Sequence, residues 1–254
     1  MGRLDGKAVI LTGAARGQGA VAAETFAKEG ARLLLSDVLS EEGERVAATI
    51  NADGGQAVFE AGDVADEATP VRLAERCLAA FGRIDVLYNN AGIILGKPIQ
   101  DTSLEEWNRI LRIDLTGPFL MSKAVIPHMM TQQAGSIINI SSAGGIVGYP
   151  SMAAYGAAKG GLVNLTRCMA VDLAAYNIRV NAICPGAIDT PMPRAYIENM
   201  DNKEAAWQRI ADAHLLKRFG TPIEVVHLAL FLAADESSFM TGSVIPVDGG
   251  QTAY

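Results

Sequence analysis

Short apolar runs alternate with segments of helical hydrophobic spacing along the whole chain. The apolar runs have the length and composition of buried strands and cover residues 8–12, 32–37, 57–60, 86–89, 136–140, 179–183 and 244–247. The segments between them repeat apolar residues at intervals of three and four, the spacing of an amphipathic helix, over residues 18–29, 40–51, 67–81, 103–130, 152–176 and 222–234.

The apolar runs indicate a parallel sheet. Residues 32–36 are almost continuously hydrophobic, which is typical of a strand buried on both faces. Together with the alternation of strand and helix, this predicts an α/β protein: a single domain over residues 1–254 with a doubly wound Rossmann fold, a seven-stranded parallel sheet and helices on both faces.

One segment, 187–220, interrupts the alternation. It is rich in proline, methionine and charged residues and follows the sixth predicted strand. An insertion at the carboxyl edge of a parallel sheet often covers a ligand crevice, so this one is expected to cover a substrate. Its apolar residues would either line a pocket or pack the insertion onto the body, and the sequence favours neither role for Met192, Tyr196, Ile197, Met200 and Trp207.

Composition and charge narrow the class of partner. Half of the 254 residues are hydrophobic, the formal net charge is −7, and no run of basic residues is present. Nucleic acid and anionic membranes select basic patches, so neither is expected as a partner. No signal-peptide core or membrane-length apolar run is seen, and the cysteines and histidines lack metal-ligand spacing, so a cytoplasmic protein without a metal is expected.

A glycine-rich loop, Thr-Gly-Ala-Ala-Arg-Gly-Gln-Gly at 12–19, follows the first predicted strand and opens the first helix. Glycine permits a tight turn and close approach of backbone to a pyrophosphate, and a helix N-terminus offers unpaired N–H groups to an anion. The loop therefore predicts a dinucleotide site, with contacts from Gly13, Arg16, Gln18 and Gly19.

An acidic residue at the end of the second strand points to the type of dinucleotide. Asp37 lies about 20 residues beyond the loop, where a carboxylate binds the adenosine ribose hydroxyls and repels a 2′-phosphate. Val38, not a basic residue, follows it and is expected to contact the cofactor together with Asp37. Arg16 is the opposing signal, because it is able to pair with a 2′-phosphate. The acidic residue lies where that phosphate would sit, so NAD is the expected cofactor.

Tyr155 and Lys159 are four residues apart, which places both on one face of a helix. A free tyrosine, with a pKa of about 10, is a poor base at neutral pH. A nearby ammonium favours the phenolate and lowers that pKa, so the pair is suited to exchanging a proton with an alcohol or ketone oxygen.

With these motifs in place, the chain closely resembles the short-chain dehydrogenase/reductase family over essentially its whole length. The matching elements, in order, are the 12–19 loop, Asp63-Val64, Asn89-Asn90-Ala91-Gly92, Ser141-Ser142, Tyr155 with Lys159, Asn181, Pro185-Gly186 and Val247-Asp248-Gly249-Gly250.

The resemblance implies roles for these residues. Ser142 would hydrogen-bond the substrate oxygen, Tyr155 would exchange the proton, and Lys159 would lower the tyrosine pKa and hold the nicotinamide ribose. The implied cofactor contacts are Asp63 and Val64 at the adenine, Asn90, Ala91 and Gly92 along the adenosine side, and Pro185, Gly186, Ile188 and Thr190 at the nicotinamide end.

One position departs from the family pattern. The family often has a catalytic asparagine in the motif N-x-x-G, where it holds a water that relays protons from the lysine; here Asp114 begins that motif. An ionised aspartate accepts hydrogen bonds but cannot donate them as an amide does. It would also stabilise the Lys159 ammonium. We expect a surviving relay with an altered pH dependence.

The leading functional hypothesis is an NAD(H)-dependent oxidoreductase that interconverts a secondary alcohol and a ketone. An NADPH-dependent 3-oxoacyl-carrier-protein reductase is the alternative within the same class, and a non-catalytic NAD-binding sensor or scaffold is the alternative outside it. The resemblance further implies a homotetramer, with a homodimer second. The sequence leaves the substrate open among steroids, cyclic alcohols, sugars and acyl chains.

Overall fold

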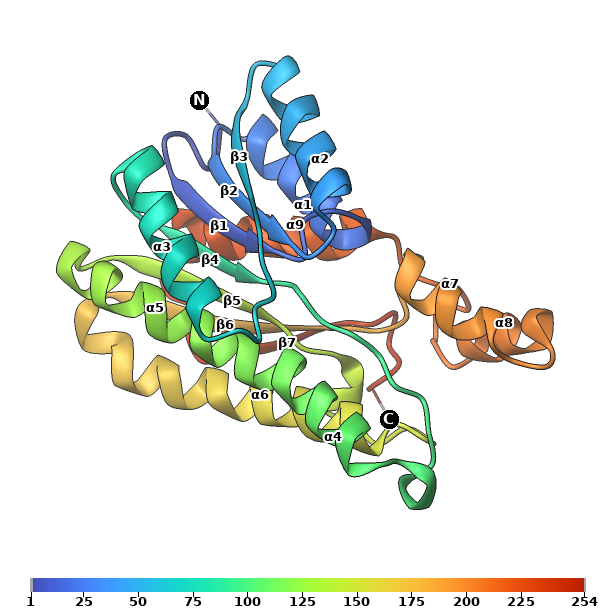
Figure 1. Cartoon of the computed structure of the whole chain (residues 1–254). Helices are drawn as coiled ribbons and strands as arrows, with labels where there is room; N and C mark the ends of the chain where they lie inside the picture. The colour runs from blue at the N-terminus through green and yellow to red at the C-terminus, as the bar shows by residue number, and fades with distance from the viewer. Residues whose placement is uncertain (1, 254) are drawn as a thin grey trace.

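A computed structural model of the chain describes residues 2–253. One sheet holds all the strands, in the order β3-β2-β1-β4-β5-β6-β7, and every neighbouring pair is parallel. The strands are β1 (Ala8–Thr12), β2 (Arg32–Asp37), β3 (Gln56–Ala61), β4 (Val86–Asn89), β5 (Gly135–Ile140), β6 (Ile178–Pro185) and β7 (Val244–Val247). The predicted doubly wound seven-stranded sheet is confirmed (Figure 1).

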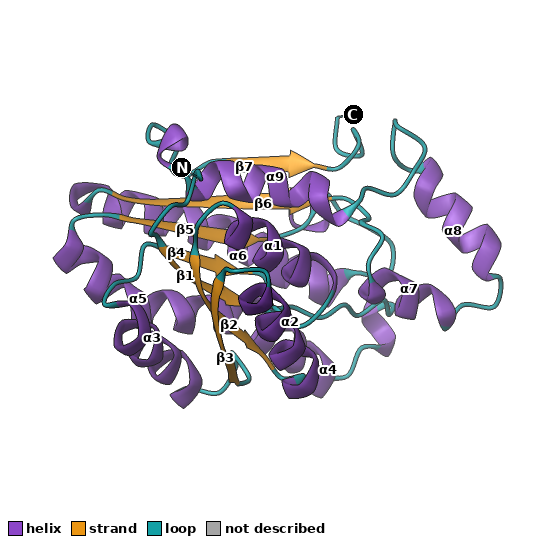
Figure 2. Ribbon diagram, turned by 90° about the horizontal axis from the view of Figure 1, so that it is seen from above, coloured by secondary structure: helices purple, strands orange, loops and turns teal. Residues whose placement is uncertain are grey.

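Helices cover both faces of the sheet. They are α1 (Gly17–Lys28), α2 (Ser40–Ala52), α3 (Ala68–Phe81), α4 (Leu104–Leu111), α5 (Gly117–Gln132), α6 (Ala153–Leu173), α7 (Pro191–Glu198), α8 (Lys203–Asp212) and α9 (Pro222–Ala233). Helices α1, α2 and α9 share one hydrophobic core, and α3, α5 and α6 share the other (Figure 2). Within residues 2–253, no helix has the length and hydrophobicity required to cross a bilayer.

The helix predicted over 103–130 is divided into three parts. Helix α4 ends at Leu111, a π-helical turn follows over Arg112–Thr116, and α5 continues from Gly117. Pro118 has no N–H to donate to the carbonyl four residues back, which disturbs the α-helical ladder at this point. The Gly117 N–H instead bonds to the Arg112 carbonyl, five residues back. Hydrophobic spacing continues across the turn, which is why the sequence predicted one helix.

The strand order changes direction at β1, in the interior of the sheet. Strand β1 pairs with β2 on one side and with β4 on the other. Strand β3 is added beyond β2 toward one side of the sheet, and the strands that follow β4 are added toward the other side. Ligands of doubly wound sheets bind at such a switch point. The inserted helices α7 and α8 project beside the carboxyl edge of the sheet (Figure 1).

The insertion has a small hydrophobic core of its own. Ile197 is buried there, and Trp207 stacks on Phe219 with ring centres 3.9 Å apart. Tyr196 and Met200 pack against the same cluster. Between the two roles that the sequence left open, the structure favours internal packing for these residues, whereas Met192 stays 38% exposed.

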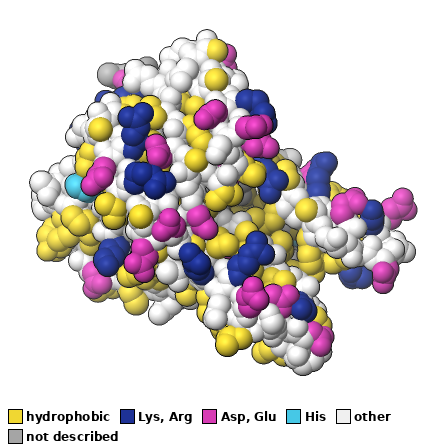
Figure 3. Space-filling model, viewed as in Figure 1, with side chains coloured by type: hydrophobic (Ala, Val, Ile, Leu, Met, Phe, Trp, Pro, Cys, Tyr) yellow, Lys and Arg dark blue, Asp and Glu magenta, His cyan; other side chains and the backbone are white. Residues whose placement is uncertain are grey.

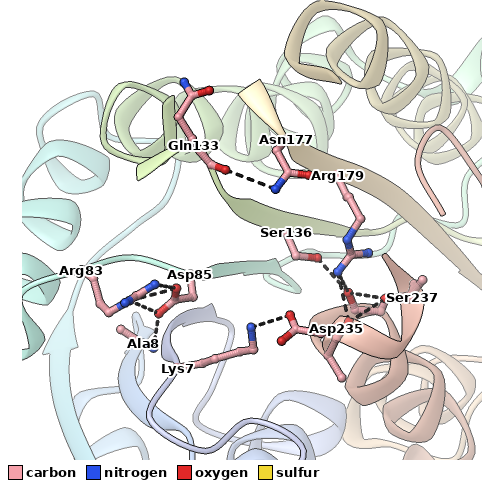
Figure 4. Close-up of polar contacts among 12 residues, drawn as sticks. Lys7, Ala8, Arg83, Asp85, Gln133, Ser136, Asn177, Arg179, Asp235 and Ser237 are labelled. Atoms are coloured by element: carbon pink, nitrogen blue, oxygen red, sulfur yellow. Dashed lines mark hydrogen bonds and ion pairs between the residues drawn. The ribbon is translucent and has the colours of Figure 1, made fainter. Parts of the chain in front are cut away.

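The opposite, amino edge of the sheet is closed by buried polar contacts (Figure 4). The Asp85 carboxylate, at the start of β4, accepts the Ala8 N–H at 2.8 Å and pairs with Arg83 at 2.6 Å. Farther along this edge, Ser136 donates to the Leu232 carbonyl at 2.8 Å, and Arg179 donates to the same carbonyl at 2.7 Å. These contacts join the starts of β1, β4, β5 and β6 to each other or to α9.

Replacing Asp85 with alanine is expected to lower the free energy of unfolding by about 1–3 kcal/mol, because it leaves the buried Ala8 N–H without an acceptor. Urea unfolding measures the change. The matched control is Asp235→Ala, which removes a carboxylate 89% exposed from its ion pair with Lys7. That variant should stay within about 0.5 kcal/mol of the parent. Equal losses in the two variants would contradict the role assigned to Asp85.

Candidate functional site

Tyr155 and Lys159 lie one turn apart near the start of α6, at the carboxyl edge of the sheet. The Lys159 Nζ is 5.8 Å from the centre of the Tyr155 ring. Ser142, two residues after β5, lies near enough to the Tyr155 phenol for its hydroxyl to lower the pKa of that phenol. Its hydroxyl also accepts the Gly144 N–H at 3.0 Å, which fixes it at the start of the loop before α6. The three side chains therefore form one cluster.

A buried ion pair lies behind this cluster. The Lys159 Nζ is 3.1 Å from Asp114 Oδ2, with the two side chains 5% and 0% exposed. Lys159 also donates to the Ile140 carbonyl at 2.9 Å, and Asp114 Oδ1 accepts the Ile93 N–H at 2.9 Å. A Cβ on Gly92 would lie 3.2 Å from Asp114 Oδ2 and 3.3 Å from the Lys159 Nζ. The absence of that atom leaves room for the pair.

Burial and charge act on the site in opposite directions. Burial raises the pKa of the Tyr155 phenol above its ordinary value; the Lys159 ammonium lowers it, and the Asp114 carboxylate raises it. Burial by itself would lower the pKa of Lys159, but Asp114 and Tyr155 outweigh burial, so this pKa is raised. Burial also raises the pKa of Asp114, against the influence of Lys159. Asp114 thus offsets part of the lowering of the Tyr155 pKa that the sequence predicted for Lys159.

The glycine loop packs directly against the chain that follows β4. Gly13 has a positive φ of 68°, and a Cβ there would lie 2.8 Å from the Cα of Ala91. A Cβ on Gly19 would lie 1.9 Å from the Gly13 carbonyl oxygen. Both positions therefore require glycine, and the loop is held close to the residues after β4.

Two of the predicted cofactor residues turn their side chains toward the protein. Gln18 Nε2 donates to the Tyr88 hydroxyl at 3.0 Å and to Asn90 Oδ1 at 3.1 Å. Asn90 Nδ2 donates to the Gly13 carbonyl at 3.0 Å. These side chains brace the loop, so a ligand would meet the backbone of Gln18 and Asn90.

Asp37 lies beside the glycine loop at the end of β2. Its Oδ2 accepts the Ala15 N–H at 3.0 Å, and its Oδ1 accepts the Leu39 N–H at 3.1 Å. The carboxylate is partly buried, whereas Val38 is 64% exposed and Arg16 is exposed. A negative charge is thus fixed next to the loop, with the opposing positive charge at the surface.

The adenine pair predicted at 63 and 64 follows β3. Asp63 is exposed, and its Oδ1 accepts the Ala65 N–H at 2.9 Å. Val64 is buried against Gly117: a Cβ added to Gly117 would lie 2.8 Å from the Cγ2 atom of Val64. This position places the pair at the same edge of the sheet as the glycine loop.

The segment after β6 passes in front of the glycine loop. Pro185 ends β6, and Gly186 leads to Ile188, which is buried. Thr190 lies at the start of α7. A Cβ added to Gly17 would lie 3.4 Å from the Cβ of Thr190. Residues far apart in the sequence are therefore brought together at one edge of the sheet.

A polar chain behind the site was not predicted. Asn89 Nδ2 donates to Asn139 Oδ1 at 2.9 Å, and Asn139 Nδ2 donates to the Thr166 hydroxyl at 2.9 Å. The chain links β4 and β5 to α6, the helix that carries Tyr155. The signal in the sequence is an asparagine within the apolar run 136–140, a position where a buried polar side chain needs a partner.

A pocket beside the cluster has a lining without charged side chains. It lies between the loop before α6 and the first turn of that helix, and its lining includes Gly144, Ile146, Val147, Tyr149, Met152 and Gly156. In Figure 3 the surface is hollowed between the body and the projecting α7–α8 segment, and hydrophobic side chains border the hollow. A Cβ on Gly96 would lie 2.2 Å from the Tyr196 hydroxyl, so the insertion touches the loop after β4.

Known proteins similar to this chain cover its whole length. The family model described as enoyl-(acyl carrier protein) reductase matches residues 13–252. The chain is 44% identical over 253 residues to the cyclopentanol dehydrogenase of Comamonas sp., covering 100% of both chains. It is 40% identical over 248 residues to the 3-oxoacyl-(acyl-carrier-protein) reductase of Thermotoga maritima, covering 98% of each.

Among solved structures, the crystal structure of levodione reductase superposes with a TM-score of 0.95 at 36% identity, covering 98% of this chain and 99% of that one. The family model, the relatives and the shared fold agree with the motifs at the carboxyl edge. The chain belongs to the short-chain dehydrogenase/reductase family.

Proposed function

We propose that the protein is an NAD(H)-dependent oxidoreductase that interconverts a secondary alcohol and a ketone. The observation that carries the proposal is the cluster in which Ser142 and Lys159 both lie beside the Tyr155 phenol and both lower its pKa. The similarity to cyclopentanol dehydrogenase and levodione reductase supports this class of reaction.

The residues around the glycine loop fit a dinucleotide. The first turn of α1 carries no acidic residue, and no side chain caps its N–H groups, so it is suited to a pyrophosphate. Asp37 would bind the adenosine ribose, and Asp63 with Val64 would contact the adenine. The segment from Pro185 to Thr190 would hold the nicotinamide end, whose chemistry is to accept or give up a hydride at the carbinol carbon.

The chain's own side chains would handle the proton. In alcohol oxidation, the Tyr155 phenolate takes the hydroxyl proton as the carbinol hydride leaves; in ketone reduction, the phenol returns that proton to the oxygen. Ser142 would hold the same oxygen by a hydrogen bond. Lys159 would stabilise the phenolate and bind the nicotinamide ribose, while Asp114 keeps the ammonium charged inside the protein.

An uncharged, compact substrate fits the site best. The pocket beside Ser142 lacks charged side chains, and Tyr196 against Gly96 narrows the gap between the insertion and the body. We propose a cyclic secondary alcohol or its ketone, the type of substrate named for the cyclopentanol dehydrogenase. Helices α7 and α8 would cover it.

Similarity to the Thermotoga maritima reductase favours a second candidate, an NADPH-dependent 3-oxoacyl-carrier-protein reductase. The Asp37 carboxylate beside the loop argues against it, because it would repel a 2′-phosphate. A non-catalytic sensor would not need the assembled cluster of Ser142, Tyr155 and Lys159.

We also propose a homotetramer, with a homodimer second. Large apolar side chains are exposed on α4, α5 and α6 and near β7: Leu104 at 73%, Phe119 at 44%, Val171 at 80% and Phe239 at 105%. These side chains would be candidates for burial between subunits.

Replacing Tyr155 with phenylalanine is expected to lower kcat by about 10²–10⁴-fold, because the proton acceptor is removed. NADH binding should persist, since the phenol contributes to proton transfer more than to affinity. Cyclopentanol oxidation followed by NADH absorbance, with NADH fluorescence for binding, measures both. An active phenylalanine variant would overturn the mechanism.

Replacing Asp114 with asparagine should move the rising limb of the oxidation pH profile to lower pH. Asp114 raises the pKa of Tyr155, and the Tyr155 phenolate itself favours the Lys159 ammonium when Asp114 is neutralised. Removing the Asp114 charge therefore lowers the pKa of Tyr155, and the phenolate required for oxidation forms at lower pH. The control is Glu106→Gln on nearby α4, which makes the same charge change in a partly exposed ion pair with Lys97 and should leave the profile in place. An unchanged Asp114→Asn profile would count against any role of this charge.

Replacing Asp37 with asparagine should raise the ratio of NADPH-dependent to NADH-dependent kcat/KM by about tenfold, equivalent to ~1.4 kcal/mol for one charge. The amide oxygen still accepts the Ala15 N–H of the loop, and only the acceptor of the Leu39 N–H is lost. Arg16→Ala is the companion variant and should not raise the ratio. A parent protein that strongly prefers NADPH would refute the NAD assignment.

A further inference from the structure

His214, between α8 and α9, is buried and bonded through both ring nitrogens. It is 2% exposed; its Nδ1 lies 2.8 Å from the Ile210 carbonyl, and its Nε2 lies 3.1 Å from the Ala187 nitrogen. The Ala187 N–H can only donate, so Nε2 must accept and Nδ1 must carry the hydrogen that is donated to Ile210. The ring thus joins the end of α8 to the segment after β6.

Three segments meet around this ring. A Cβ on Gly186 would lie 2.7 Å from His214 Nε2, and a Cβ on Gly249 would lie 3.4 Å from the His214 Cβ. The Gly186 N–H bonds to the Val247 carbonyl at 3.1 Å, and the Leu216 N–H bonds to the Gly249 carbonyl at 3.2 Å. The glycines of the Pro-Gly and Asp-Gly-Gly motifs leave the space that the imidazole fills.

The contacts of His214 set the direction of the neighbouring backbone groups. The Ala187 carbonyl accepts the Gly220 N–H at 2.9 Å, and the Asp189 N–H donates to the Gly220 carbonyl at 2.8 Å. Backbone groups of successive extended residues point to opposite edges, so the Ile188 N–H faces away from the insertion. Ile188 is buried, and its N–H has no acceptor among residues 2–253.

We propose that His214 is a positioning residue for the dinucleotide. By holding the Ala187 N–H on one side, it turns the Ile188 N–H toward the place of the nicotinamide carboxamide, an amide whose oxygen would accept it. This inference rests on the proposed function, because it supposes a nicotinamide in front of the segment. It also couples the insertion and the C-terminal turn to cofactor binding.

Two variants of His214 distinguish the two hydrogen bonds that its imidazole ring makes. In His214→Gln the side-chain oxygen reaches the position of Nε2 and can still accept the Ala187 N–H. In His214→Asn the amide nitrogen stands near Nδ1 and keeps the bond to Ile210, but nothing reaches Ala187. Each variant retains one hydrogen bond, so a purely stabilising histidine predicts similar behaviour of both.

Hydrogen exchange of the Ala187 amide and NADH affinity by fluorescence are the measurements. His214→Asn should speed the exchange in the protein without nucleotide and weaken NADH binding about tenfold, the effect of one misplaced hydrogen bond. His214→Gln should stay within about twofold of the parent. Where His214→Asn does not fold, Gly186→Ala takes its place, because the new Cβ would push the ring from Ala187; weaker NADH binding is again expected.

Equal changes in the two His214 variants, or none in either, with normal parent binding, would overturn the positioning role alone. A parent protein that binds no NADH would overturn the proposed function and this inference together.

Discussion

The buried ammonium of Lys159 is the constraint on which the rest of the site depends. An ammonium out of water is tolerated only with a close counter-charge and filled hydrogen bonds. Here the carboxylate of Asp114 and the carbonyl of Ile140 supply them, from the π-helical turn and the end of β5. Gly92 leaves the space for the pair. Sheet, turn and loop must all be in register for α6 to keep this charge beside Tyr155.

The strands were predicted from local pattern because the sheet is buried on both faces. The bounds expected for β1, β2, β4 and β7 match the structure, since each is an apolar run limited by polar or glycine residues. The predicted 103–130 helix is interrupted at the π-helical turn over Arg112–Thr116, where the spacing of apolar residues continues although the hydrogen-bond ladder changes. Hydrophobic periodicity predicts which face of a helix is buried, but it does not predict such a local change in helical pitch.

The site was predictable where motif and local spacing define it, as for Tyr155 with Lys159. Contacts between distant segments were not. No sequence motif includes His214, and only the fold brings it to Ala187, 27 residues away. The balance of charge around Tyr155 was also hidden, because burial of the phenol depends on packing that no short pattern records.

The hydrogen bonds of Asp85, Ser136 and Arg179 fasten the sheet at the edge opposite to the chemistry. Changes of length or composition in the loops of the carboxyl edge therefore leave this frame intact. Mutations can therefore change substrate recognition and folding separately. Substitutions in the loop before α6 or in α7 and α8 alter which substrate binds, while the contacts at the amino edge preserve the fold. Such a division makes one architecture suitable for repeated diversification of specificity.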